Sequence, residues 1–373
     1  MITKIIQDVK LNGDKAIKKY TLKFDKIKLT NIKVAPSQIK SAYLNVDAYF
    51  IEALKIAKKN IDKFNENILI KKERTIETSA GVKCWREFRP IEKIGLYVPG
   101  GLATYPSTVL MLGVPAKIAG CTKIVLCSPP PISDAILVAA DIVGITEIFQ
   151  VGGAQAIAAM TYGTKCVPRV QKIFGPGNKY VMQAKMLVSQ DVAIDMPAGP
   201  SEIAILADET ANPKFIQADL ASQLEHGPDT KAWLITTNQN LYKKIKIGKK
   251  ILIKNINAGI KKINELAPEH LEIIVKNEKQ VIAKIVNAGS VFIGSYSPVP
   301  AGDYITGPNH TLPTSSWAKV YSALSVEDFG KMVEFQKVSE PGLSGLKDYI
   351  IKLAETEGLP KHAEAIKIRF KND

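Results

Sequence analysis

The stretch IGLYVPGGLATYPSTVLMLGVPAKIAGCTKIVLC, residues 94–127, decides the fold class. It begins with a short apolar run at 94–98, passes through a turn rich in Gly and Pro, continues as a helical pattern at 107–119 and ends in a second apolar run at 123–127. An apolar strand that leads through a helix into another apolar strand is typical of a parallel sheet buried on both faces. The stretch therefore predicts a strand–helix–strand unit.

The same alternation continues along the chain to residue 294. The further expected strands are short apolar runs at 147–151, 192–196, 202–206, 232–236, 271–275 and 290–294. The helical patterns between them lie at 133–143, 154–162, 179–189, 213–224 and 279–288. Such a series of strands suits either one barrel or two Rossmann-like halves. Junctions rich in Gly and Pro at Gly95 and at 198–200 favour two halves, the first inserted in the second.

We therefore expect an α/β protein with two Rossmann-like domains of mostly parallel sheets, one inserted in the other, plus a helical C-terminal tail. A length of 373 residues suits two main domains with an appendage. The expected segments are an N-terminal helical segment at 1–20, a discontinuous domain at 21–96 and 202–324, an inserted domain at 97–201, and the tail at 325–373.

Three patterns outside the sheets complete the expected layout. Residues 37–66 carry one helical pattern with Ser37 as its expected N-cap, and Val82 begins an extended stretch that ends at Pro90. After Leu324 the pattern is purely helical. A tail of this kind rarely buries its apolar face alone, so we expect it to pack on another domain or subunit.

The composition, 46% hydrophobic and 23% charged, is that of a soluble globular protein. No run reaches the roughly 18 uninterrupted apolar residues that a membrane helix needs. The opening residues MITKIIQDVKLNGDK lack the apolar core and cleavage site of a secretory signal. The four cysteines form no C-x-x-C pair and are expected to be reduced core thiols. We expect a cytoplasmic protein without a membrane partner.

The formal net charge of +14 raises the alternative of a nucleic-acid-binding protein. Nearly all of this charge is Lys, whereas the reading of base edges favours Arg. The densest basic segment, 243–262, alternates Lys with Ile, which is typical of the solvated face of amphipathic elements. We therefore expect no nucleic-acid partner.

Each of the four histidines has an acidic or amide side chain near it in the sequence. The pairs are Gln223 with His226, Glu269 with His270, Asp303 with His310, and Glu357 with His362. A lone histidine is often a hydrogen-bonded structural residue, but four such pairs point to chemistry. Histidine is the commonest metal ligand and general base near neutral pH, and zinc accepts imidazole together with carboxylate or amide oxygen. The spacing matches no H-E-x-x-H motif, so zinc is a hypothesis at this point.

Three segments rich in glycine, at 97–107, 151–159 and 173–181, resemble junctions between a strand and a loop. Gly100 and Gly101 allow close backbone approach, and the amides at a helix start can receive a nucleotide phosphate. None of the segments fits G-x-G-x-x-G with an acidic residue about 20 positions on, so they suit either a dinucleotide site or plain tight turns. A fourth turn carries Ser201, which could meet a substrate.

Taken together, these segments closely resemble the histidinol dehydrogenase family. The matching stretches span 95–362 in the family's order and are GLYVPGGLATYPSTVLMLGVPAKIAGC, VGGAQAIAA, KIFGPGN, IDMPAGPSE, SQLEHGPD, PEHLEI, AGSVF and GDYITGPNHTLPT, followed by Glu357 and His362. The longest stretch is highly specific. The resemblance implies the NAD-dependent oxidation of L-histidinol through L-histidinal to L-histidine, the last step of histidine biosynthesis, with one zinc per subunit that anchors the substrate.

The resemblance also implies residue roles. The implied zinc ligands are Gln223, His226, Asp303 and His362. The implied acid–base pair is Glu269 and His270. The implied substrate contacts are Ser201, His310 and Glu357 together with the zinc ligands and His270. The implied NAD contacts are Tyr97, Gln155 and Asn178. The family forms an intertwined homodimer in which the tail completes the partner's site, which agrees with the unpaired apolar tail expected above.

Two other functions stay open. A zinc hydrolase would use Glu269 as the base on a metal-bound water, but it assigns no role to the glycine-rich strand ends. A Lys-rich nucleic-acid-binding protein would bind with steep salt dependence. The chain departs from the family pattern in a shorter N-terminus, in a shorter stretch between Thr236 and Ala267, and in Val299, where many relatives carry Glu. None of these departures removes a residue named above.

Overall fold

The structure is a computed structural model, which describes residues 1–69, 71–100 and 104–371. It confirms the expected α/β class, with parallel sheets and a helical C-terminal end. Gly101, expected to allow close backbone approach, lies outside the described residues. Within the part that is described, no helix is both long and apolar enough to cross a membrane.

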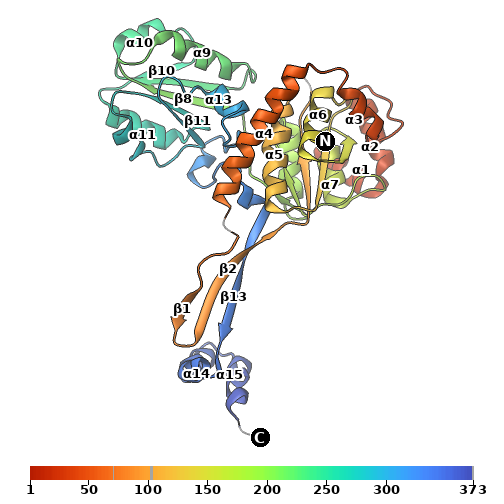
Figure 1. Cartoon of the computed structure of the whole chain (residues 1–373), viewed down its shortest axis with the longest axis vertical. Helices are drawn as coiled ribbons and strands as arrows, with labels where there is room; N and C mark the ends of the chain where they lie inside the picture. Colours follow the sequence, from red (N-terminus) through yellow and green to blue (C-terminus); the bar gives the residue numbers. More distant parts are fainter. Residues whose placement is uncertain (70, 101–103, 372–373) are drawn as a thin grey trace. The chain divides into compact units, whose positions relative to one another are not determined.

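The chain divides into two compact units. Unit 1 comprises Met1–Ile68 and Ile91–Phe329, and unit 2 comprises Leu69–Pro90 and Gly330–Asp373. Figure 1 labels the elements of both units. The boundaries of these units differ from those of the expected domains, and the expected division around 97–201 stays a prediction.

The first sheet of unit 1 is parallel and has the strand order β5-β4-β3-β6-β7. Its strands are β3 (Lys93–Tyr97), β4 (Lys123–Ser128), β5 (Glu147–Gln150), β6 (Lys172–Phe174) and β7 (Ala193–Ile194). The chain starts in the middle at β3, adds β4 and β5 on one side and then β6 and β7 on the other. The direction of winding therefore reverses between β3 and β6. In open parallel sheets, ligands bind outside the carboxyl ends of the strands at such a point.

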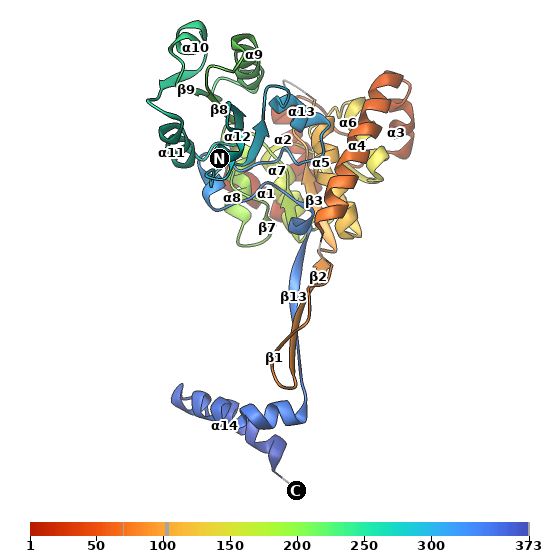
Figure 2. The same cartoon turned by 60° about the vertical axis from the view of Figure 1, so that its left-hand side comes forward.

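Helices cover both faces of this sheet. One face carries α1 (Ile2–Asn12), α2 (Asp14–Phe24), α7 (Gly153–Tyr162) and α8 (Lys179–Val188), whose apolar side chains share a core with the sheet. The remaining helices of this part, which pack on one another, are α3 (Pro36–Ala42), α4 (Ala48–Ile68), α5 (Pro106–Ala119) and α6 (Asp134–Val143). In both views, the orange α4 lies beside α5 (Figures 1 and 2).

Both segments predicted to be helical in the N-terminal part are helical, but each is divided into two helices. The segment at 1–20 forms two helices because Gly13 between them has a left-handed φ of 51°, which ends the first helix. The segment at 37–66 also splits in two, and the N-cap of the first part is Ala35 rather than Ser37. Pro36 begins that helix, since a helix start requires no amide donor at this position.

The second sheet of unit 1 is also parallel, with the order β10-β9-β8-β11-β12. Its strands are β8 (Glu202–Ala207), β9 (Lys231–Thr236), β10 (Lys249–Leu252), β11 (His270–Ile274) and β12 (Ser290–Ile293). The helices that share a core with one face are α9 (Pro213–Leu224), α10 (Gln239–Lys244) and, through Val299, α13 (Val299–Tyr304). Those on the other face are α11 (Ile256–Leu266) and α12 (Glu278–Ile282). Successive β8 residues alternate between the two cores, which explains the continuous apolar run.

All eight strands expected from apolar runs are confirmed, although β7 is shorter than its run. β6 and β10 were not expected, because β6 has only three residues and β10 is a Lys-rich edge strand. Edge strands carry such charges since one side faces solvent. The expected helix at 279–288 ends at Ile282.

Unit 2 consists of an antiparallel sheet and a helical hairpin. The sheet has the order β1-β2-β13, with β1 (Ile76–Ser79), β2 (Val82–Pro90) and β13 (Gly330–Val338), and the hairpin is α14 (Glu340–Thr356) and α15 (Pro360–Lys367). The expectation that the chain is purely helical after Leu324 is therefore wrong. β13 pairs with β2 along its whole length, and Trp85 stacks on Phe335 with ring centroids 5.4 Å apart. The expected extended stretch from Val82 to Pro90 is confirmed.

The four cysteines are free thiols. Cys121 and Cys127 are buried, as expected of core thiols, whereas Cys84 is half-buried. Cys166 is exposed, so the expectation of a core position is wrong for this residue. It lies in the loop between α7 and β6, where the apolar pattern gives no sign of burial.

Candidate active site

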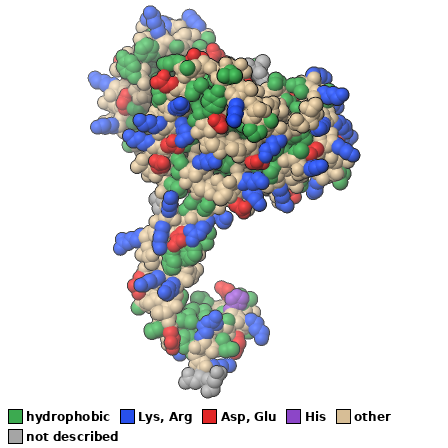
Figure 3. Space-filling model, turned by 45° about the vertical axis from the view of Figure 1, so that its right-hand side comes forward, with side chains coloured by type: hydrophobic (Ala, Val, Ile, Leu, Met, Phe, Trp, Pro, Cys, Tyr) green, Lys and Arg blue, Asp and Glu red, His purple; other side chains and the backbone are tan. Residues whose placement is uncertain are grey.

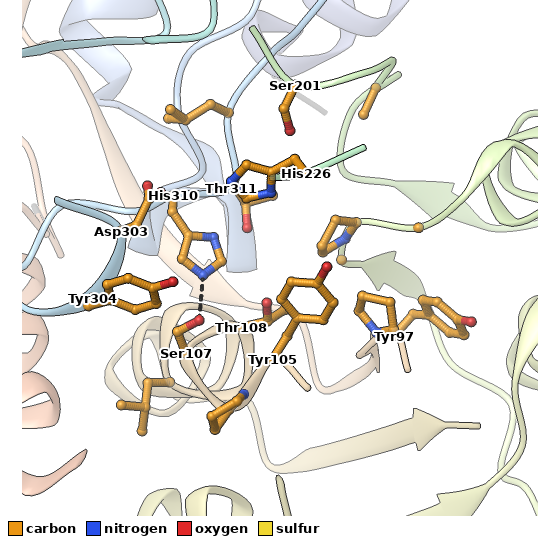
Figure 4. Close-up of a pocket in the computed structure, with 18 of the residues that line it drawn as sticks. Tyr97, Tyr105, Ser107, Thr108, Ser201, His226, Asp303, Tyr304, His310 and Thr311 are labelled. Carbon is orange, nitrogen blue, oxygen red and sulfur yellow. Dashed lines mark hydrogen bonds between the residues drawn. The ribbon is translucent and has the colours of Figure 1, made fainter. Parts of the chain in front are cut away.

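A pocket of ≈ 910 Å³ in unit 1 is lined by residues from both parallel sheets. Figure 4 shows Tyr97 on one side of it and Ser201, His226 and Asp303 on the other. Part of the wall comes from α4, through Phe50 and neighbouring apolar residues. The pocket therefore joins residues that lie far apart in the sequence.

The two sheets present opposite edges to this pocket. The first sheet contributes its carboxyl edge, because Tyr97 ends β3 and the turn 175–178 follows β6. The second sheet contributes its amino edge, because Ser201 precedes β8 and His270 begins β11. The first sheet thus offers the usual ligand-binding edge of an open parallel sheet, and the second supplies titratable side chains from the opposite edge.

His270 is oriented by the backbone of the neighbouring strand. Its Nδ1 lies 3.0 Å from the carbonyl oxygen of Glu202. A carbonyl only accepts, so in the neutral ring the hydrogen sits on Nδ1 and Nε2 is left with its lone pair. Nε2 is buried without a hydrogen-bond partner and lies 3.5 Å from an Asp303 carboxylate oxygen. This atom can accept a proton from a molecule in the pocket.

Glu269 is held by the same backbone segment. The amide of Glu202 donates to its Oε2 over 2.8 Å, and this oxygen lies 3.6 Å from Nδ1 of His270. Burial raises the pKa of Glu269 to about 7, although the His270 imidazolium opposes the shift. Burial lowers the pKa of His270, but the carboxylates of Glu269 and Asp303 outweigh it and raise the pKa to about 9. A pKa of about 9 favours the protonated ring of His270 at neutral pH, so Nε2 accepts a proton only from the neutral form of the ring.

A metal could be held by three residues of unit 1, of which His226 and Asp303 line the pocket whereas Gln223 is not among its lining residues. Gln223, in the last turn of α9, is buried, and neither its amide oxygen nor its amide nitrogen has a hydrogen-bond partner. A buried amide without partners is costly, so it fits an oxygen ligand for a cation. His226, just beyond the same helix, and Asp303, on α13, line the pocket. Amide, imidazole and carboxylate together suit zinc.

No group of three His, Cys, Asp or Glu side chains with metal-site geometry occurs in the part of the chain that the structure describes. Only His226 and Asp303 of the predicted ligands are of these types within unit 1. Glu357, just after α14, and His362, in the first turn of α15, belong to unit 2, and both side chains are exposed. Their predicted roles as substrate contact and zinc ligand stay predictions.

The other predicted substrate contacts line the pocket. Ser201 is half-buried at its edge. Nε2 of His310 lies 3.3 Å from the Ser107 hydroxyl at the start of α5 (Figure 4). Burial lowers the pKa of His310, so its ring is neutral at neutral pH and can act as a hydrogen-bond partner.

Of the three predicted NAD contacts, two line the pocket and one does not. Tyr97 is buried against the pocket, and its hydroxyl accepts from the amide of Gly153 over 3.0 Å. Asn178 lines the pocket and caps the start of α8 with its side-chain oxygen. Gln155 is buried within α7 and is not among the residues that line the described pocket. The structure therefore brings two of the three residues to the pocket.

Four functional features were missed by the sequence reasoning. They are Ser107, the backbone of Glu202, the pocket wall from α4, and an ion pair between Lys185 and Asp195. Asp195 lies in the quoted segment IDMPAGPSE, and Lys185 is the one charge that follows Lys179 in the expected helix at 179–189. The two charges stand among mostly apolar residues, and this was the feature of the sequence that could have indicated a buried ion pair.

Comparisons with known proteins match this chain to histidinol dehydrogenases over almost its whole length. The family model for histidinol dehydrogenase matches residues 1–247 and 246–370. A histidinol dehydrogenase from Clostridium acetobutylicum is 47% identical over 393 residues, covering 98% of this chain and 91% of that protein. One from Archaeoglobus fulgidus is 45% identical, covering 98% and 94%. The crystal structure of histidinol dehydrogenase from Elizabethkingia anophelis aligns with a TM-score of 0.96 at 44% identity, covering 99% of this chain and 91% of that one.

Proposed function

Because this chain belongs to the histidinol dehydrogenase family of oxidoreductases, we propose that it oxidises L-histidinol through L-histidinal to L-histidine with NAD, as the last step of histidine biosynthesis. The observation that carries the proposal is the free Nε2 of His270 beside Glu269, in the same pocket as the carboxyl edge of the first sheet. A base and a nucleotide-binding edge in one pocket suit the removal of a proton from a hydroxyl group and of a hydride from the carbon that carries it.

Each of the two oxidations releases one proton and one hydride from the substrate. In the first, Nε2 of His270 takes the proton of the alcohol. In the second, Glu269, helped by His270, takes a proton from the water that adds to the aldehyde. The pKa of Glu269, raised by burial to about 7, suits this role because the carboxylate can both gain and lose a proton near neutral pH.

NAD, when bound, accepts the hydride in each step, so two molecules are used per histidinol. We assign its contacts to Tyr97, Gln155 and Asn178. Tyr97 and Asn178 lie where β3 ends and α8 begins, at the pocket's first-sheet edge. Gln155 would need a rotation of its side chain or a shift of α7 to reach the pocket.

Zinc, when bound, anchors the amino and imidazole groups of histidinol. We assign it to Gln223, His226 and Asp303 together with His362 of the partner subunit. The unpartnered amide of Gln223 supports the assignment, because a cation would satisfy its oxygen. Ser201, His310 and Glu357 would hold the rest of the substrate.

The helical hairpin of unit 2 supports a homodimer with shared sites. It exposes large apolar side chains, with Tyr349 72% and Leu353 65% exposed, and Ile368, directly after α15, is 61% exposed. Apolar surface of this extent on a two-helix element calls for a cover. We propose that it packs on the partner chain in the cytoplasm and brings His362 and Glu357 to the partner's site.

The test measures the absorbance of reduced nicotinamide with histidinol and with histidinal, with and without a chelator. We expect reduction with both substrates and its loss on chelation. No reduced cofactor from zinc-loaded protein would reject the proposal and favour a zinc hydrolase. A nucleic-acid-binding protein is disfavoured by Figure 3, where Lys and Arg are interspersed with acidic and apolar side chains on the face that it shows.

A further inference from the structure

An ion pair lies almost fully buried in the wall of the pocket. Lys185, on α8, and Asp195, just after β7, are paired, and their side chains are 1% and 2% exposed. Both residues line the pocket. The mechanism above gives neither of them a proton to move or a substrate group to hold.

The pair holds both backbone polar groups of one residue, Gly175. Nζ of Lys185 donates to the carbonyl oxygen of Gly175 over 2.9 Å. Oδ2 of Asp195 accepts from the amide of Gly175 over 2.7 Å, and its Oδ1 accepts from the amide of Met196 over 2.8 Å. Gly175 directly follows β6, so the pair fixes the start of the turn that leads to Asn178.

Gly175 is also pressed against the end of β3. Its φ is +121°, and a Cβ atom there would lie 2.1 Å from the carbonyl oxygen of Tyr97. Only glycine fits such an approach with such a φ. The ion pair therefore holds in place the two strand ends, β3 and β6, between which the winding of the sheet reverses.

General stability is a weak reason for such a pair. A buried ion pair loses its hydration, and an apolar pair of similar volume is often as stable or more so. A fully hydrogen-bonded polar cluster can instead specify one conformation among several. Here the specified conformation is that of the turn 175–178, at the edge assigned to NAD.

We propose that Lys185 and Asp195 are positioning residues that hold the turn 175–178 in its NAD-binding conformation, so that the pair sets the affinity for NAD and not that for histidinol. This inference rests on the proposed function. Since the pair acts through the turn and touches no reacting atom, its loss should change the binding of the dinucleotide while leaving the chemistry at His270 intact.

The test variant is the double substitution Lys185→Met and Asp195→Asn, which removes both charges together and leaves no buried charge unpaired. We expect the KM for NAD to rise about tenfold, which corresponds to the loss of one or two hydrogen bonds from the turn. We expect kcat at saturating NAD and the KM for histidinol to stay within about twofold of the wild-type values. Calorimetric titration with NAD alone should show the same loss of affinity without any turnover.

The matched control removes an ion pair of the same sheet that lies outside the pocket lining. Lys33 and Glu147 pair over 2.6 Å, with side chains 50% and 30% exposed. Lys33→Met with Glu147→Gln should leave both KM values unchanged. If the test variant binds NAD as the control does, or if its KM for histidinol rises as much as that for NAD, the inference is wrong.

A second variant covers the case in which the double substitution prevents folding. Lys185→Ala opens space at the pocket wall for a small amine, and ethylammonium should restore at least part of the NAD affinity. Absence of any rescue in folded protein would contradict the inference. The wild-type protein separates this result from the proposed function, because wild type that neither binds nor reduces NAD would refute the latter.

Discussion

His270 takes its orientation from the main chain of the neighbouring strand rather than from a carboxylate side chain. The carbonyl of Glu202 faces Nδ1, and the amide of the same residue holds Glu269. A strand in the middle of a sheet is a rigid support, since its other groups are paired on both sides. Backbone groups of β8 therefore preorganise the proposed acid–base pair. A substitution can remove the side chain of Glu269 or His270, but it does not remove the backbone groups that orient them.

His270→Asn should abolish turnover and leave the zinc content near that of wild type. Asparagine keeps a polar side chain but offers no nitrogen that can take the alcohol proton, so we expect kcat to fall by about 10²–10⁴. Steady-state assays and metal analysis of the purified variant check this. Loss of zinc would instead place His270 among the metal ligands.

Glu269→Gln should slow the oxidation of histidinal more than that of histidinol. The amide keeps the hydrogen bond from the Glu202 backbone but cannot take a proton from water. We expect the aldehyde step to slow by roughly 10²-fold or more, a typical loss for a general base, and the alcohol step by less. The rates with each substrate supplied separately measure the two steps, and equal slowing would remove the special role of Glu269 with water.

Glu272 provides a prediction on pH and stability. Burial and the adjacent Asp219 carboxyl raise the pKa of Glu272, and its Oε2 has no partner. The unfolded chain loses this proton at a lower pH than the folded protein, so the free energy of unfolding falls as the pH rises between the two pKa values.

Glu272→Gln removes this titration. We expect the stability of this variant relative to that of wild type to be ~1–3 kcal/mol greater at about pH 8 than at about pH 5. Urea unfolding at the two pH values measures the difference. Glu265→Gln, at an exposed position, is the control and should show no such change. A pH-independent difference for Glu272→Gln would contradict the raised pKa.

At the scale of elements, the amino edge of the second sheet depends on the connection from α12 to β12. The amides of Gly289 and Ser290 donate to the carbonyl oxygens of Pro268 and Glu269, both over 2.9 Å. A Cβ atom on Gly289 would lie 2.6 Å from the carbonyl oxygen of Glu269. This connection therefore packs directly against the backbone of Glu269, the first residue of the proposed acid–base pair.

Gly289→Ala should consequently reduce both stability and kcat. Overpacking of this kind costs about 1–3 kcal/mol, and the backbone shift would displace Glu269. Urea unfolding and the rate with histidinal report the two effects. Val286→Ala, at a 78% exposed position in the same connection, should change neither. A wild-type rate for Gly289→Ala would show that the pair tolerates this displacement.

At the scale of the whole molecule, the shared-site homodimer predicts complementation between two inactive chains. One chain carries His270→Asn and the other carries His362→Ala. In a mixed dimer with exchanged tails, one of the two sites combines the intact His270 with the intact His362. Random mixing in equal amounts should restore about one quarter of the wild-type activity.

The control mixes each inactive chain with itself, and both mixtures should stay inactive. Formation of mixed dimers is verified by tagging the two chains differently. Verified mixed dimers without activity would show that each site draws all of its residues from one chain, so that the proposed exchange of tails is wrong.

Much of the fold could be predicted from the sequence because its signals are local. The apolar runs of β3, β4, β5, β8, β9, β11 and β12 are each bounded by turns, and burial on both faces requires such runs. The proximity of Glu269 to His270 is likewise local, since the two are neighbours in the chain. β13 was missed because its partner β2 lies more than 200 positions earlier, beyond any local pattern.

The sequence by itself indicated most of the strands and helices of unit 1 and the side chains that we propose to carry chemistry, because periodicity and residue type act over a few neighbouring positions. The tertiary structure alone decided which edge of each sheet faces the pocket, that the Glu202 carbonyl sets the proton position on His270, and that Lys185 meets Asp195 in the wall. Those outcomes depend on hydrogen bonds and burial between segments far apart in the chain, and such contacts exist only once the sheets are assembled.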